Sequence, residues 1–371
     1  MNAVPTVHEG MASGDRRGRG RYTLTETEHD RVWGVCDAVD GIFGEPWRGT
    51  YELFGWIAEA VEVGDRVGSR VWLVPDDASL EPWLLEDVQR TAGQVRGRDS
   101  LVLTGLDDYE APPEGHRGRV RVHDGRQWLG SCREFARILP AARVAPPLVL
   151  RGLAPSDRLR AALAKGTRRS LNLEEAALEL RDDAGELLID RLVWATVSGW
   201  RPSSYGPDLI DLELDGEFFD PVPAYARPIW ERWLAGPPNR PGAWAGLDTR
   251  GREVWLELVR ERGCRRAHRD RPAGHIYELD GRHITDVPGL YLALGEAVNG
   301  PGGYFGGCLP ALDDCLRGTF GYTAPATLHW RNAATAHEHL SHVLTPDGRP
   351  YDLIAETLEA LAAGGMRVTV M

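Results

Sequence analysis

The segment at residues 304–316, Tyr-Phe-Gly-Gly-Cys-Leu-Pro-Ala-Leu-Asp-Asp-Cys-Leu, decides the fold of the C-terminal part of the chain. An aromatic pair and two glycines lead into a short helix, along which leucines recur at helical spacing. The far face of this helix carries two adjacent carboxylates, Asp313 and Asp314. The pattern therefore predicts a rigid element that presents negative charge, which suits a partner whose own site holds phosphate.

The flanking segments predict strands that alternate with helices. Residues 276–281 read as a strand that ends in a turn, and Asp286 is suited to cap an apolar helix that runs to Val298. A strand at 326–330, a helix at 351–361, a stop at Gly364-Gly365 and a strand at 366–370 complete the chain. This order, with apolar strands, indicates a small parallel sheet covered by helices.

These residues resemble the barstar-type inhibitors of microbial ribonucleases, over roughly residues 275–371. The resemblance is carried by the Asp-Gly turn at 280–281, the aromatic-Gly lead-in, the Ala-Leu-x-Asp-Cys-Leu helix core, the Leu-x-Trp-Arg strand and the Val-Thr-Val ending. It implies an α/β domain with a three-stranded parallel sheet and helices. It also implies that the domain blocks an extracellular ribonuclease while that enzyme is still inside the producing cell, without catalysis, metal or cofactor.

The resemblance implies a partner-binding surface around the acidic helix. Asp314 would occupy the phosphate subsite of the enzyme with support from Asp313, and Tyr304 would pack over the mouth of that site. The residues expected to contact the partner are Tyr304, Gly306, Asp313, Asp314, Gly318 and Glu359.

Several positions depart from the family pattern. Cys308 and Pro310 stand where the family usually has Asn and Asp, so one carboxylate that mimics phosphate is absent. Asp313 replaces a tryptophan, and the helical Glu of the interface falls at Ala360, with Glu359 beside it. Pro310 lies in the first helical turn, where a missing N–H costs little. The fold expectation survives these changes, whereas tight binding to the usual ribonuclease is weakened.

Composition and charge restrict the function further. The chain has 371 residues, enough for two or three domains, and its 42% hydrophobic and 26% charged content indicates a globular protein. Its formal charge is -12, and residues 275–371 hold eleven Asp and Glu against five Arg. That acidity argues against direct nucleic-acid binding and for a basic partner, a secreted ribonuclease or related toxin.

The cysteines and the apolar segments indicate a cytoplasmic protein. Five cysteines, an odd number, are scattered without a CxxC pair, which favours reduced thiols. No apolar segment approaches the roughly 18 residues of a membrane span, and the N-terminus has no hydrophobic signal region. We therefore expect no membrane partner.

The region before residue 260 is predicted to be strand-rich α+β, following a disordered leader at 1–21. Strands are expected at 22–25, 31–36, 51–54, 70–74 and 101–103, with a helix at 80–92. A second succession places strands at 178–181, 187–197 and 209–214, a helix at 222–234, and strands at 243–245 and 254–258. The likeness of the two successions suggests a weak internal duplication. The alternative is that any α+β chain of this length shows similar successions of strands and helices by chance.

Prolines and arginines mark the expected domain boundaries. Prolines at 146–147 divide the strand-rich region into halves at 22–145 and 146–259. An Arg- and Pro-rich linker at 260–274 then precedes the domain at 275–371. We expect this linker to be solvated or to lie against the acidic domain, in preference to nucleic acid.

The sequence lacks the usual nucleotide-binding, hydrolase and zincin motifs. It has no Walker loop, no GxGxxG after a strand, no GxSxG and no HExxH. His337, His339 and His342 are close in sequence, but solvated surface histidines are favoured over a metal site. The chain is therefore expected to act by binding. Two alternatives stay open: a binding or immunity module for another basic protein, and an enzyme within residues 22–260 that the acidic domain regulates.

Overall fold

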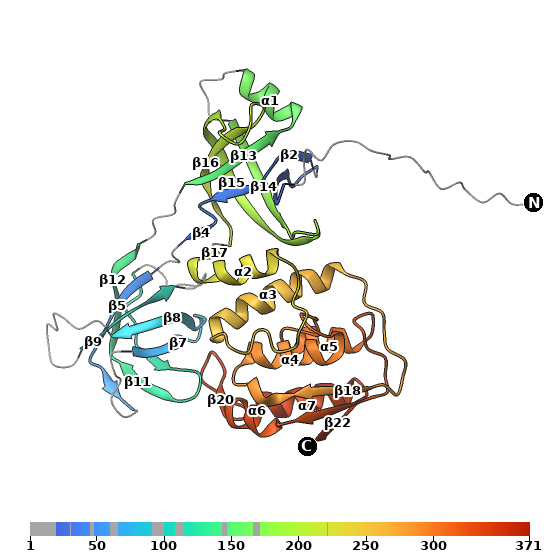
Figure 1. The fold of residues 1–371 in the computed structure, drawn as a ribbon. Helices are drawn as coiled ribbons and strands as arrows, with labels where there is room; N and C mark the ends of the chain where they lie inside the picture. The colour runs from blue at the N-terminus through green and yellow to red at the C-terminus, as the bar shows by residue number, and fades with distance from the viewer. Residues whose placement is uncertain are drawn as a thin grey trace, which may run out of the picture. The chain divides into compact units, whose positions relative to one another are not determined.

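A computed structural model describes residues 20–29, 31–44, 48–59, 66–90, 100–107, 115–142, 147–165, 171–220 and 222–371. The described residues form two compact units, each built from two separate segments of the chain (Figure 1). The first unit combines the residues up to Ile42 with Pro147–Asp220, and the second combines Phe43–Pro146 with Pro221–Met371. This division differs from the sequential halves expected at 22–145 and 146–259. The expected leader lies, except for its last two residues, outside the described residues.

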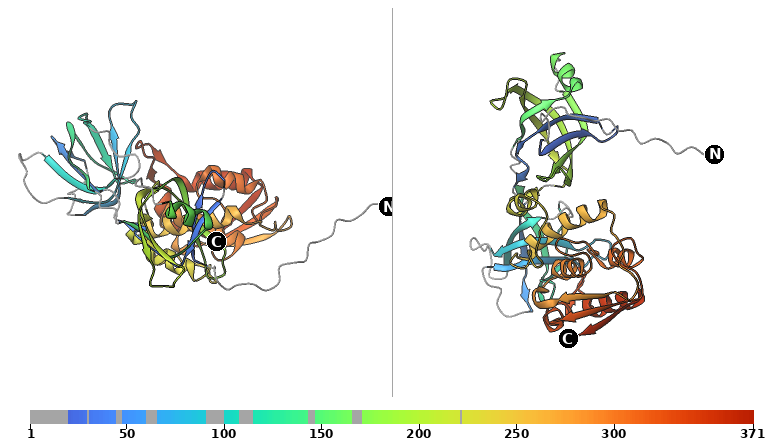
Figure 2. Two further views of the ribbon diagram at one scale, coloured as in Figure 1. Left: turned by 90° about the horizontal axis from the view of Figure 1, so that it is seen from above. Right: turned by 45° about the vertical axis from the view of Figure 1, so that its right-hand side comes forward.

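The described residues of the first unit form a seven-stranded antiparallel sheet. Its strands are β1 (Tyr22–Glu26), β2 (Arg31–Cys36), β3 (Ala38–Asp40), β13 (Leu148–Pro155), β14 (Leu171–Arg181), β15 (Leu187–Pro202) and β16 (Ile210–Phe218). The order is β16-β15-β14-β1-β2-β13-β3, and β16 also pairs with β13. That additional pairing closes six strands into a barrel, whose curvature is visible in Figure 2. Leu24, Leu150 and Leu178 are fully buried inside it.

A helix that the sequence analysis did not predict follows β13. It is α1 (Asp157–Ala164), and the Ser156 side chain caps it by accepting a hydrogen bond from the Leu159 backbone N–H. Leu159 is the residue that this helix buries.

An eight-stranded antiparallel sheet occupies the N-terminal segment of the second unit, within its described residues. Its strands, in spatial order, are β12 (Glu134–Ala142), β5 (Arg48–Phe54), β9 (Ser100–Asp107), β8 (Trp83–Arg90), β7 (Arg66–Pro75), β10 (Val120–His123), β11 (Trp128–Cys132) and β6 (Ile57–Ala58). Alternate residues form its core, in which the Tyr51 and Phe135 rings stack at 5.3 Å.

The helix expected at 80–92 is wrong, because β8 occupies most of that range. β8 is hydrogen-bonded to β7 on one edge and to β9 on the other, and its residues Trp83, Leu85 and Val88 join the core. Non-local pairing on two edges stabilises a strand here, whatever the local helical propensity.

The strands expected at 243–245 and 254–258 are also wrong. Residues 243–245 lie in turns, and residues 254–258 lie in α3 (Thr249–Arg265). Asp248 caps α3 by accepting from the Gly251 N–H at 2.9 Å, and Val254, Trp255 and Leu258 are buried at helical spacing. The run Val-Trp-Leu-Glu-Leu is compatible with the apolar spacing of a strand and with that of a helix. The Asp248 cap favours the helix. The helix expected at 222–234 is shorter, as α2 (Arg227–Leu234) after β17 (Val222–Pro223) and a 3-10 turn at Ala224–Ala226.

The structure does not arrange the two successions as repeated domains. Strands β1 and β2 of the first succession share a sheet with β14–β16 of the second, while β5–β9 belong to the other unit. A short parallel pair between β17 and β4 (Phe43–Gly44) belongs to the second unit.

The C-terminal domain has the expected architecture, a three-stranded parallel sheet with helices. Within residues 222–371, all of which the structure describes, the strand order is β18 (Ile276–Asp280), β19 (Ala326–Arg331) and β22 (Met366–Val370). The helices are α4 (Val287–Asn299), α5 (Leu309–Leu316), α6 (Ala333–Leu340) and α7 (Leu353–Ala363), with a 3-10 turn at Gly281–His283 and a hairpin of β20 (Val343–Leu344) and β21 (Pro350–Tyr351). Figure 1 shows α4 and α5 on one side of the sheet.

Burial along the strands explains this one-sided arrangement. In β18, Tyr277 and Leu279 are buried while Ile276, Glu278 and Asp280 are exposed. Alternation of this kind places one face of the sheet against the helices and leaves the other open. The Asp286 cap is confirmed, since its Oδ1 accepts from the Gly289 N–H at 2.8 Å.

Helix α3 packs against α4, and α2 packs against α3, so these two helices belong physically to the C-terminal domain. The Arg252 guanidinium of α3 is almost fully buried and pairs with Asp286 at 3.1 Å. It also donates to the Thr285 hydroxyl at 2.8 Å and to the Ala245 carbonyl at 2.8 Å. The linker expected at 260–274 is therefore corrected in its first part, because residues 260–265 are the last turns of α3.

Candidate functional site

The acidic helix α5 starts at an uncapped position. Cys308 has an extended backbone at the N-cap, with φ −154° and ψ 171°, but its side chain accepts no capping hydrogen bond. Pro310 lies in the first turn without breaking the helix, as expected. Leu312, Cys315 and Leu316 face the core, and burial raises the pKa of the Cys315 thiol to about 12. The helix is therefore fixed by its apolar face.

The two carboxylates of α5 are exposed on the opposite face. The side chains of Asp313 and Asp314 are 50% and 68% exposed. Arg317, one turn further on, pairs with both of them, at 3.3 Å between its Nη1 and Asp314 Oδ1. This arginine partly balances the negative charge that a partner would meet. Exposed pairs of this kind contribute little to stability and exchange readily for other partners.

Glycines shape both ends of α5. Gly306 has φ +91° and is buried, and a Cβ added there would lie 2.9 Å from the Leu312 Cα. Gly318 has φ +104° just after the helix, where only the Asp270 carboxylate and the Tyr322 carbonyl would be within 4 Å of a Cβ. Gly306 therefore holds the turn into α5, whereas Gly318 ends the helix with room on its surface.

Glu359 is exposed on α7, which packs against α5. The Asp352 side chain caps α7 by accepting from the Ala355 N–H at 2.9 Å. Inside α7, the buried Thr357 hydroxyl donates to the Leu353 carbonyl at 2.7 Å. The structure thus brings Glu359 and the α5 carboxylates onto neighbouring helices of one domain.

Tyr304 differs from the other expected contacts, because it is buried. Its exposed fraction is 5%, and its ring meets the Phe320 ring edge-on at 5.9 Å. Gly263 of α3 lies against it, so that a Cβ on Gly263 would be 2.3 Å from the Tyr304 Cβ. This burial raises the pKa of the Tyr304 hydroxyl. Tyr304 therefore does not present the exposed ring that the resemblance implied, since α3 covers it.

Sequence reasoning missed the two residues that modify this surface. Gly263 lies in a stretch taken for a linker, and nothing in its neighbours signals contact with a loop forty residues later. Arg317 carried a usable signal, because an arginine three and four residues after two aspartates faces them on a helix.

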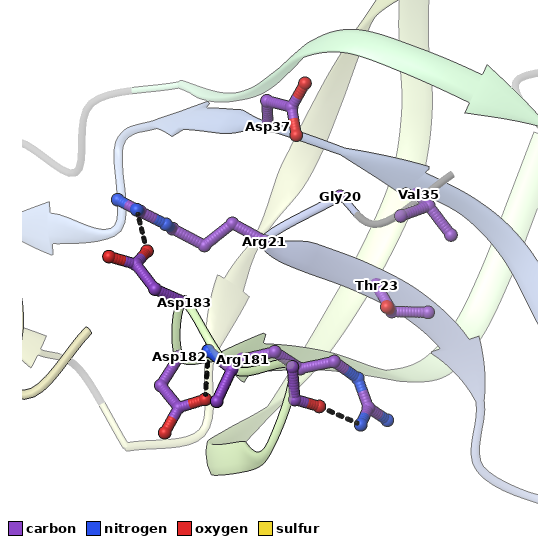
Figure 3. Close-up of a pocket in the computed structure, with 10 residues that line it drawn as sticks. Gly20, Arg21, Thr23, Val35, Asp37, Arg181, Asp182 and Asp183 are labelled. Atoms are coloured by element: carbon purple, nitrogen blue, oxygen red, sulfur yellow. Dashed lines mark hydrogen bonds and ion pairs between the residues drawn. The ribbon is translucent and has the colours of Figure 1, made fainter. Parts of the chain in front are cut away.

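A separate pocket of about 600 Å³ lies in the first unit (Figure 3). Its lining includes Arg21, Asp37, Arg181, Asp182 and Asp183. Arg21 Nη2 pairs with Asp183 Oδ1 at 2.7 Å across it, and Arg181 pairs with Glu179. Its described lining residues include carboxylates and arginines but no His, Cys or Ser.

The cysteines and histidines behave as surface or core groups. All five cysteines are free. The His339 Nδ1 lies 2.9 Å from the Thr335 carbonyl, and the His337 Nδ1 lies 3.1 Å from the Ser341 hydroxyl. Within the described parts of the chain, no group of three or more His, Cys, Asp or Glu could hold a metal ion. No helix there is long and apolar enough to cross a membrane.

A family model described as Barstar (barnase inhibitor) matches residues 274–346. The match covers β18 through β20, including α4, α5 and the two acidic residues, and the structure continues the same domain through α7 and β22. It is consistent with a barstar-type domain at the C-terminus, and the region before it has no family match. The comparisons with curated proteins and with solved structures found no match.

Proposed function

We propose that this protein binds a basic microbial ribonuclease of its own cell and inhibits it by covering the active site with the α5 side of the C-terminal domain. The observation that carries the proposal is Asp314. It is a 68% exposed carboxylate on a rigid helix, within a segment that matches a family of barnase inhibitors. The protein is proposed to act in the cytoplasm, where it would meet the enzyme before secretion.

The mechanism is steric and electrostatic. Asp314 would enter the subsite that holds a phosphate of the substrate, and the enzyme's cationic groups would replace Arg317 as its partner. Hydrogen bonds between charged groups are stronger than neutral ones, so this exchange favours the complex once water is excluded. The excess of negative charge in residues 275–371 would steer the approach of a basic enzyme and make association sensitive to salt.

Three features support an interface narrower than the family's usual one. Cys308 and Pro310 supply neither the Asn nor the Asp of the family pattern, and Tyr304 is covered by α3. Asp313, Gly318 and Glu359 remain as expected contacts around Asp314. Gly306 is buried and contributes by holding the turn into α5. We therefore expect weaker inhibition than is usual for the family.

Asp314→Ala tests the proposal. In the complex it would leave the enzyme's basic groups unpaired in a dehydrated interface. Truncating one member of such a pair costs about 2–5 kcal/mol, mostly as faster dissociation, a range for which the type complex of this family, barnase with barstar, is itself the standard example. The measurement is binding kinetics against a barnase-like ribonuclease at two salt concentrations.

The matched control is Glu278→Ala, which removes the same charge from the open face of β18. It should change association slightly through net charge and leave dissociation unaltered. If Asp314→Ala dissociates no faster than the parent, α5 is not the inhibitory surface.

A second candidate is a binding or immunity module for a different basic protein. The burial of Tyr304 favours it, because the covered ring removes one contact on which a barnase-like partner would depend. A pull-down with the full chain from its native organism separates the two, since the second candidate requires a basic partner that has no ribonuclease activity.

A further inference from the structure

A cationic pocket of about 280 Å³ lies between the end of α3 and the loop that leads into α5. Four arginines and a histidine line it, together with the glycines of that loop. Its charged and amide side chains are Arg262, Arg266, His268, Arg269, Arg271 and Asn299, and Tyr304 also lines it. None of the described residues that line it is an Asp or a Glu. The pocket thus concentrates positive charge on a domain whose net charge is negative.

The segment that carries these arginines is fixed in place. The Asp270 carboxylate accepts from the Thr319 N–H at 3.0 Å and from the Gly321 N–H at 2.9 Å. The Arg271 N–H donates to the Gly321 carbonyl at 3.3 Å. The second part of the expected linker is therefore anchored to the loop after α5, which fixes the backbone positions of Arg269 and Arg271.

The same contacts place the neighbouring carboxylate on backbone amides, which stabilise its negative charge. Asp270 lies between Arg269 and Arg271, and backbone amides donate to both of its oxygens. Glu261, beside Arg262, pairs with Arg260 and Arg265. The Gly263 carbonyl at the end of α3 receives the Arg266 N–H at 3.3 Å and lies 2.9 Å from His268 Nε2. With that contact made, the carbonyl dipole at the helix end is largely satisfied.

The arginines differ in how strongly other groups hold them. Arg262 and Arg266 make further contacts within the chain. For Arg269 and Arg271 the structure gives no ion pair with a carboxylate among the described residues, and both are exposed. These two guanidinium groups can therefore turn to a ligand at little cost.

The opposite wall is equally rigid. The Asn299 side-chain amide donates to the Tyr304 carbonyl at 2.7 Å and to the Phe320 carbonyl at 2.9 Å. These two hydrogen bonds fix the backbone that follows Gly302 and Gly303, the two glycines that line this side of the pocket. The His268 ring packs on the Phe320 ring, with 5.7 Å between the centroids.

We infer that this pocket binds a small phosphate-bearing anion, either inorganic phosphate or the terminal phosphate of a nucleotide. A phosphate has more acceptor oxygens than a carboxylate, and planar guanidinium groups pair with it through two parallel hydrogen bonds. The volume is at the lower end of small-molecule pockets, which suits a phosphate group with little attached to it. The ligand would bridge α3 and the loop that carries Tyr304, and would hold α3 over that ring.

The test is calorimetric titration of the full chain with inorganic phosphate, with a nucleoside 5′-monophosphate and with the unphosphorylated nucleoside, at constant ionic strength set by chloride. Saturable binding of a phosphate-bearing probe and none of the nucleoside is expected. Equal affinity for the two phosphates identifies the free anion as the ligand, and tighter binding of the nucleotide identifies the nucleotide. Absence of saturable binding by both phosphates overturns the inference.

Arg269→Gln combined with Arg271→Gln should weaken binding about tenfold or more, because two charge-assisted hydrogen-bonding groups are lost. Both residues are exposed, so the melting temperature without ligand should stay unchanged. The matched control is Arg331→Gln combined with Arg367→Gln, which removes two exposed positive charges from β19 and β22. An equal loss in the control variant would show non-specific charge attraction and overturn the site. The result is independent of ribonuclease inhibition, since no enzyme is present in the assay.

Discussion

Tyr304 and Asp314 belong to one expected partner surface, but the structure exposes only one of them. Asp314 lies on a helix whose apolar face is buried, and its carboxylate points to solvent. Tyr304 lies in the loop before that helix, and Gly263 of α3 covers it. The difference shows that a segment outside the matched residues determines how much of the surface is open. Changes that loosen α3 should therefore alter Tyr304 and leave α5 intact.

Asp286→Ala should have the largest effect on stability. The aspartate caps α4 and also neutralises Arg252, which is almost fully buried in α3. Removing one partner of a buried ion pair lowers the free energy of unfolding by about 3–5 kcal/mol. The loss of a helix cap alone lowers it by about 1 kcal/mol. Denaturant unfolding of the full chain, followed through the C-terminal transition, measures this loss. The control is Glu338→Ala, at an exposed position of α6. A loss for Asp286→Ala of only the capping size would show that α3 is not integral to the domain.

Gly263→Ala should have the next largest effect. The new Cβ would lie 2.3 Å from the buried Tyr304 Cβ, so α3 or the loop must move. Overpacking of this kind costs about 1–3 kcal/mol. We expect faster nitration of Tyr304, measured by peptide mass spectrometry, with α5 unchanged. Gly246→Ala, where a Cβ would meet nothing within 4 Å, is the control. Unchanged nitration of Tyr304 in the first variant would contradict the covering role of α3.

Cys308→Asn should stabilise the domain. The Cys308 backbone already has the extended conformation of an N-cap, but its side chain makes no capping hydrogen bond. Asparagine at such a position accepts from a free N–H of the first turn and contributes about 1 kcal/mol. Thermal unfolding should show a higher midpoint. Cys308→Ala separates the cap from the loss of the thiol, and an equal gain in both variants would exclude capping as the cause.

Arg317→Ala should have the smallest effect on stability and a visible effect on binding. It frees Asp313 and Asp314 from an exposed ion pair that contributes little to folding. The α5 surface then becomes more negative, so association with a basic ribonuclease should be faster at low salt. Stopped-flow association rates measure this. Arg282→Ala raises the net negative charge equally and serves as the control. If the two variants accelerate association by the same factor, the rate depends on net charge alone, and the special role of the α5 surface is contradicted.

The C-terminal domain was largely readable from sequence because its signals are local. The strands at 276–280 and 366–370, the helices α4, α5 and α7, and the Asp286 cap each depend on a few neighbouring residues. The exposed carboxylates Asp313 and Asp314 follow from the same helical spacing. Local periodicity and capping therefore determined the elements and one part of the candidate site.

Other features of the fold and of the candidate site depend on tertiary contacts and could not be predicted from local sequence patterns. β8 is a strand because β7 and β9 pair with both of its edges, and β1 joins β14 across about 150 residues of sequence to complete a closed sheet. Tyr304 is buried because α3 lies over it, and the anchored arginines form a pocket because Asp270 binds a distant loop. Each of these outcomes depends on contacts between residues far apart in the chain. The free energy of such contacts depends on packing and water exclusion, which no window of neighbouring residues contains.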